Sequence, residues 1–90
     1  MKPSLPGADL IEAGLSDLAA GRESIPALLV LIGGPRLRRC GIEVPESPIR
    51  TPEHRLYEKL AASEPDAAHS RYNALVRRLV SFERALECAG

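Results

Sequence analysis

P-D-A-A-H-S-R-Y-N-A-L-V-R-R-L-V-S-F-E-R-A-L-E-C, residues 65–88, is the stretch that decides the fold. From Ala68 onward its apolar residues recur at alternating spacings of four and three, which is typical of a helix that buries one face. The pattern predicts a long helix over 65–88 whose apolar face belongs to the core or meets a partner. We call the following residues of this face the apolar seam: Tyr72, Leu75, Leu79, Phe82 and Leu86.

Two helices are predicted near the start of the chain, after an extended lead-in over residues 1–8. Asp9 is a suitable N-cap, an apolar stripe follows at helical spacing, and Gly21 is a suitable end, so the first helix spans about 9–20. Ser24 is the next candidate cap, with Pro26 in the first turn. The apolar run over 27–32 that follows is read as a buried helix, with a buried strand as the alternative.

Two further helices are predicted in the middle of the chain. Pro35 opens a short helix over 36–40, which Gly41 closes, and Ile42 is placed for the apolar contact of a Schellman end. Residues 42–51 are expected to form an extended connection. Thr51 and Pro52 then begin a helix that ends near residue 63. The predicted fold is all-α: a small antiparallel bundle of four main helices plus one short helix, forming a single domain over 9–90.

Composition excludes several classes of protein. Ninety residues leave room for one domain, and the formal net charge of zero argues against a freestanding nucleic-acid-binding domain, which is usually basic. Two cysteines are too few for a disulfide-stapled secreted domain. The N-terminus lacks a signal-peptide pattern and the longest apolar run is too short to cross a membrane. We therefore expect a cytoplasmic protein.

Arginines are concentrated on the last predicted helix. They are expected to form a ridge opposite the apolar seam, where they would bind an acidic partner or a phosphate backbone, or simply be solvated. We call them the arginine ridge: Arg71, Arg77, Arg78 and Arg84.

The remaining candidates for chemistry are weak. Gly33 and Gly34 precede a cluster of arginines, but no complete phosphate-binding motif is present. Two histidines and two cysteines have no zinc-ligand spacing, and a buried structural role is favoured for both cysteines. These four are His54, His69, Cys40 and Cys88. The sequence therefore predicts no catalytic residue, metal site or cofactor.

The sequence leads to one functional hypothesis and one alternative. The leading hypothesis is a non-catalytic interaction module that forms a homodimer or docks on another protein through its apolar seam. The alternative is binding of nucleic acid or phosphate by the arginine ridge.

Overall fold

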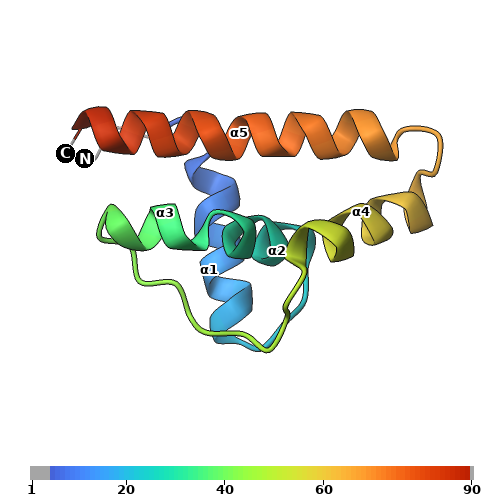
Figure 1. Ribbon diagram of the computed structural model, residues 1–90, viewed down its shortest axis with the longest axis horizontal. Helices are drawn as coiled ribbons and strands as arrows, with labels where there is room; N and C mark the ends of the chain where they lie inside the picture. Colours follow the sequence, from blue (N-terminus) through green and yellow to red (C-terminus); the bar gives the residue numbers. More distant parts are fainter. Residues whose placement is uncertain (1–4, 90) are drawn as a thin grey trace.

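The computed structural model describes residues 5–89, which form five α-helices (Figure 1). The predicted all-α fold is confirmed, and no strand occurs within the described range. The shortest helix has six residues and the next shortest has eight. None of the described helices is both long and apolar enough to span a membrane. The helices are α1 (Ala8–Ala19), α2 (Ile25–Ile32), α3 (Gly34–Arg39), α4 (Pro52–Ser63) and α5 (Ala68–Ala89).

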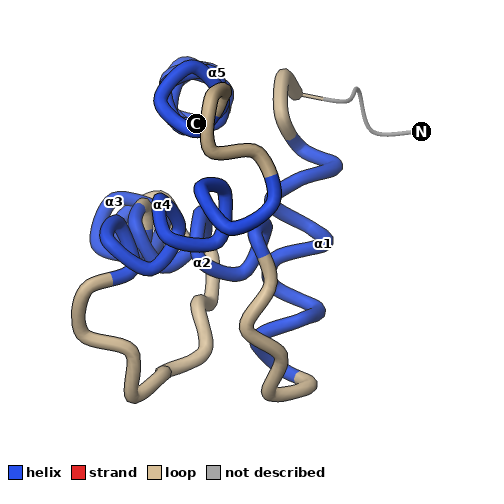
Figure 2. The backbone as a smooth tube through the Cα atoms, turned by 90° about the vertical axis from the view of Figure 1, so that its right-hand side faces the viewer, coloured by secondary structure: helices blue, strands red, loops and turns tan. Residues whose placement is uncertain are grey.

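The helices are arranged in two levels with one helix crossing them. Figure 1 shows α5 extended above a row formed by α3, α2 and α4, while α1 runs across this direction. In Figure 2, α5 is seen nearly end-on, with the other helices on one side of it. α4 and α5 run antiparallel because only a short turn joins them. The crossing of α1 distinguishes the fold from a bundle in which all neighbouring helices are antiparallel.

The apolar run at 27–32 forms a helix and not a strand. The Ser24 hydroxyl accepts a hydrogen bond from the backbone N–H of Ala27 (3.2 Å), so Ser24 caps α2 as predicted. Four consecutive residues of this helix, Ala27 to Val30, are fully buried. α2 packs mainly against α1 and α4 and also contacts α5, so the middle of this apolar helix is enclosed by its neighbours.

Three helices begin at a different residue from the one predicted. α1 begins at Ala8, with Gly7 and not Asp9 in the N-cap position, which leaves the Asp9 carboxylate available for a distant partner. α3 begins at Gly34, two residues earlier than predicted. α5 begins at Ala68 because residues 65–67 form a turn in which the Ala67 N–H donates to the Glu64 carbonyl. These changes leave the order of the helices unaltered.

Two predictions concern segments outside the helices: the end of α3 and the lead-in before α1. α3 closes with the predicted Schellman motif: Gly41 has a φ of 90°, and the Ile42 N–H donates to the Leu37 carbonyl at 3.0 Å. Of the predicted lead-in, residues 1–4 lie outside the described range. Leu5 is half-buried and packs against the core, so the chain is already anchored before α1 begins.

An ion pair between α4 and the turn before α2 leads to a pH prediction. Arg55 Nε donates to Glu23 Oε2 at 3.0 Å, and this hydrogen bond lowers the pKa of Glu23 below its ordinary 4.5. A lowered folded-state pKa means that the pair stabilises the fold above about pH 4.5 and that this contribution is lost as pH falls through the folded pKa. We expect Arg55→Met to lower the melting temperature slightly at neutral pH, because exposed pairs contribute little, and to match the wild type in acid. Thermal melts followed by circular dichroism test this, with Arg77→Met, which removes an exposed guanidinium, as the control.

Candidate functional site

The apolar seam of α5 lies on the core of its own chain. Leu79 and Phe82 are buried members of the core, and the other three seam residues are partly buried and pack against it. Hydrophobic contacts with the other helices of the chain therefore already cover the centre of this face. A partner cannot reach Leu79 or Phe82 while α5 remains docked, and only the edges of the seam are accessible.

The close approach of α5 depends on Gly33, at the corner between α2 and α3. A Cβ atom at this position would lie 2.8 Å from Leu79 Cδ1 and 2.9 Å from Glu83 Oε2, both well inside van der Waals contact. The sequence indicates only that Gly33 interrupts a helix. The structure gives Gly33 a second role: because it has no side chain, α5 can pack closely against the corner between α2 and α3.

A row of apolar side chains runs along the flank of α5, beside the seam. Tyr72, Val76 and Val80 are spaced by four residues, so they are neighbours on the helix surface. Val76 and Val80 are half-buried and do not belong to the hydrophobic core. At the start of the row, Tyr57 of α4 contacts Tyr72 with a ring-centroid distance of 5.9 Å, and Tyr57 is 39% exposed. We call Tyr57, Tyr72, Val76 and Val80 the apolar row.

The four arginines expected in one ridge divide into two pairs with different surroundings. Arg78 Nη2 lies 3.0 Å from Asp9 Oδ1 of α1, and Arg71 Nη1 lies 2.9 Å from Glu64 Oε1. Arg77 and Arg84 are exposed and form no ion pair with any described residue.

Helix geometry explains the division of the ridge. Successive residues are rotated by about 100° around the axis, so Arg78 cannot share the outer face with Arg77. Arg78 instead lies on the flank that faces Asp9 at the start of α1. The expectation of a single ridge opposite the seam is therefore wrong, and only Arg77 and Arg84 occupy the outer face.

The histidines and cysteines do not assemble into a site. Each histidine contacts a residue four positions along its own helix: His54 contacts Glu58 at 3.3 Å and His69 contacts Asn73 at 3.2 Å. Cys40 is half-buried and Cys88 is exposed, and both are free thiols, so the prediction that both are buried is wrong for Cys88. Within residues 5–89 no three side chains of the metal-binding types gather closely enough to hold an ion.

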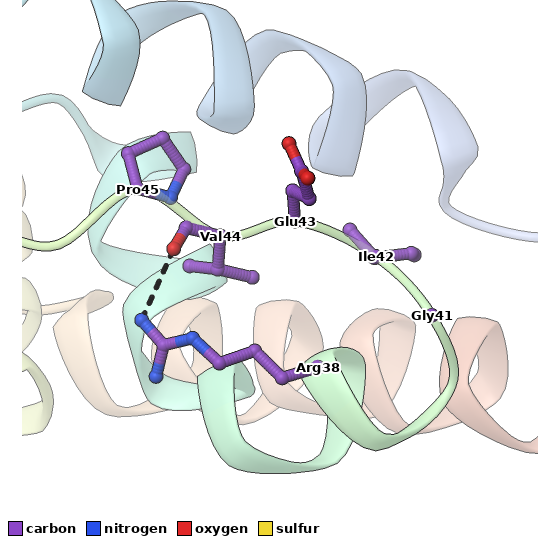
Figure 3. Close-up of a pocket in the computed structure, with 6 residues that line it drawn as sticks. All are labelled: Arg38, Gly41, Ile42, Glu43, Val44 and Pro45. Carbon is purple, nitrogen blue, oxygen red and sulfur yellow. Dashed lines mark hydrogen bonds between the residues drawn. The ribbon is translucent and has the colours of Figure 1, made fainter.

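A hollow of about 550 Å³ in the described surface lies under the loop that follows α3 (Figure 3). A side-chain hydrogen bond from Arg38 Nη2 to the Val44 carbonyl, at 3.1 Å, ties the loop to α3. Figure 3 shows the Glu43 carboxylate pointing away from the Arg38 guanidinium. The charged groups do not converge on one point, so the hollow presents no constellation for catalysis. It is lined by Arg38, Gly41, Ile42, Glu43, Val44 and Pro45.

One buried charged group was not singled out by the sequence reasoning. Glu83 of α5 is only 4% exposed, and its Oε1 lies 3.6 Å from Arg36 Nη1 of α3. Burial raises the pKa of Glu83 above its ordinary value, although the charge of Arg36 opposes this and that of Glu87 reinforces it. The sequence did contain a signal for this burial. Glu83 directly follows Phe82 of the apolar seam, so its side chain lies near the buried face of the helix.

Comparison with known proteins adds no assignment to these surfaces. No protein-family model, curated protein or solved structure that was compared with the chain gives a match.

Proposed function

We propose that this protein is a non-catalytic helical interaction module that binds a protein partner through α5, with a second copy of the same chain as the first partner to test. The observation that supports the proposal is the apolar row. Val76 and Val80 are half-buried but lie outside the core, and Tyr57, at 39%, is the most exposed large apolar side chain among the described residues. Contiguous apolar surface that the chain covers only in part is typical of a contact surface.

The surroundings of the row suit a protein contact. Arg84 lies one helical turn after Val80, and Arg77 directly follows Val76, so the row has a charged border on the outer side of α5. Protein interfaces commonly have an apolar centre with a polar rim, and tyrosine and arginine are enriched in them. The proposed contact therefore moves from the buried centre of the seam to its accessible flank, with Tyr72 common to both.

Binding of nucleic acid or phosphate is the weaker candidate. Its affinity would depend on unpaired cations, because each phosphate contact is made by a cationic group that releases a counterion. Two of the four arginines of α5 are engaged with Glu64 and Asp9, and the chain as a whole has a formal net charge of zero.

A charge placed within the apolar row tests the proposal. We expect the wild type to elute with about twice the 9.7 kDa mass of one chain in size-exclusion chromatography with light scattering. Val80→Glu should weaken self-association at least about tenfold, because a buried interfacial charge without a partner is costly. Circular dichroism should show that the variant remains helical, since Val80 is outside the core.

Ser81→Glu provides the matched control. Ser81 is exposed and adjacent to Val80 in sequence, but helix geometry places it on another side of α5. It should associate like the wild type. A wild type that is monomeric at every accessible concentration, or equal association of the Val80 and Ser81 variants, would contradict homodimerisation through the row.

A further inference from the structure

The second half of α5 is attached to α3 by one arginine that contacts two carboxylates. Arg36 lies 2.5 Å from Glu87 Oε1 through its Nε and Nη2 atoms, and 3.6 Å from Glu83 Oε1 through Nη1. Glu83 and Glu87 are one helical turn apart, so both can face the same guanidinium. We call Arg36, Glu83 and Glu87 the charge clasp.

The two carboxylates differ in how much they depend on Arg36. The Glu87 side chain is 45% exposed, so water can solvate its charge without help. The Glu83 side chain is 5% exposed and its Oε2 lies against Gly33, so water has little access to it. Among the described residues, Arg36 is the only cationic group that forms an ion pair with Glu83. A buried charge that loses its partner strongly destabilises the fold, whereas the intact buried pair contributes little to the free energy of folding in either direction.

We propose that the charge clasp is a conformational device that decides whether the second half of α5, residues 79–88, stays docked. When the charge of Arg36 is removed or engaged elsewhere, the Glu83 carboxylate can regain water only if this part of the helix leaves the α2–α3 corner. Opening would uncover Leu79, Phe82 and Leu86 of the apolar seam. The inference stands on the ion pairs and does not depend on homodimerisation through the apolar row.

Other ionisable groups lie at the same end of the molecule. Arg36 and Glu87 share a surface hollow with Arg39 of α3 and with Cys40, the residue that follows this helix. Neither Arg39 nor Cys40 is paired with Glu83 in the structure. The sign of the pH dependence follows from burial. The folded protein binds a proton on Glu83 more tightly than the unfolded chain, so its contribution to stability is present in acid and is lost as pH rises through the folded pKa. Acid should therefore favour the docked helix when Arg36 is neutralised.

Hydrogen exchange measured by mass spectrometry at neutral pH tests the clasp. Arg36→Met keeps the apolar stem but removes the charge, and we expect exchange at residues 79–88 to become at least about tenfold faster. Peptides from α1 and α2 should keep wild-type protection. Lowering the pH should reduce the difference between Arg36→Met and the wild type, with both compared at the same pH.

A second substitution separates charge from packing. In Arg36→Met/Glu83→Gln the buried carboxylate is absent, so protection at residues 79–88 should return toward the wild type. Arg50→Met removes an exposed arginine from the connection before α4 that forms no ion pair with any described residue, and it should have no effect. The proposal is overturned if Arg36→Met speeds exchange equally throughout the chain, if it changes nothing, or if the double variant remains as open as the single one.

Discussion

Gly14→Ala is expected to destabilise the fold strongly. Gly14 is buried where α1 crosses α2, and a Cβ atom there would lie 2.3 Å from the Pro26 carbonyl oxygen and 2.5 Å from Val30 Cγ2. The first of these contacts is with backbone, which cannot rotate away as a side chain can. The two helices would have to separate and give up the packing that buries Ile11 and Val30. We expect a loss of about 3 kcal/mol or more in the free energy of unfolding.

That loss is large for a chain of this size. A domain of 90 residues has a total stability of roughly 5–13 kcal/mol on the usual per-residue scale. Urea denaturation followed by circular dichroism measures the change. Gly34→Ala is the matched control, because the nearest atom to its added Cβ would be Arg38 Nη1 at 3.6 Å, an ordinary contact. Gly34 lies in α3, so alanine should be neutral or stabilise the protein by up to about 1 kcal/mol. Equal stability of the two variants would contradict the close crossing of α1 and α2.

Leu28→Ala should cost about 2–5 kcal/mol of stability. Leu28 has no exposed surface and lies at the centre of α2, which is enclosed by α1, α4 and α5. Removing its side chain loses the transfer free energy of the apolar atoms and leaves a cavity that surrounding helices can only partly fill. The same urea experiment should show a lower denaturation midpoint with little change in slope, because the surface exposed on unfolding is almost unchanged.

The control for Leu28 is the same substitution at a less buried position. Leu15 of α1 is half-buried at the edge of the core, where water and neighbouring side chains can fill the space left by truncation. Leu15→Ala should therefore cost no more than about half as much. If the two substitutions had the same effect, the placement of α2 at the centre of the core would be contradicted.

The predictions from local sequence were accurate where the deciding interaction is itself local. The cap of α2 is Ser24, four residues or fewer from the groups that it organises, and the end of α3 is made by Gly41 and Ile42 within one turn of the helix. The apolar periodicity of residues 68–86 likewise predicted both the length of α5 and the face that it buries. Asp9 shows the limit: it has the chemistry of an N-cap, but its carboxylate pairs with Arg78, 69 residues away in the sequence.

The candidate surfaces required the tertiary structure. Helix geometry by itself divides the arginines of α5 into two pairs, but whether an arginine is free depends on which acidic residue another helix brings to it. Asp9 reaches Arg78 only because α1 crosses toward α5. Glu83 reads as a surface residue between Phe82 and Arg84, and it is buried only because Gly33 lets α5 approach the α2–α3 corner.

The sequence by itself determined that this chain is helical, where its five helices lie to within a few residues, and which face of the long helix is apolar. Those properties follow from hydrogen bonds, caps and side-chain periodicity within one or a few turns. Only the tertiary structure decided that the seam is used by the core, that the apolar row remains partly exposed, and that Arg36 must compensate a buried carboxylate. Those outcomes depend on how closely helices distant in sequence approach one another, and that distance is set by the combined packing of all of them.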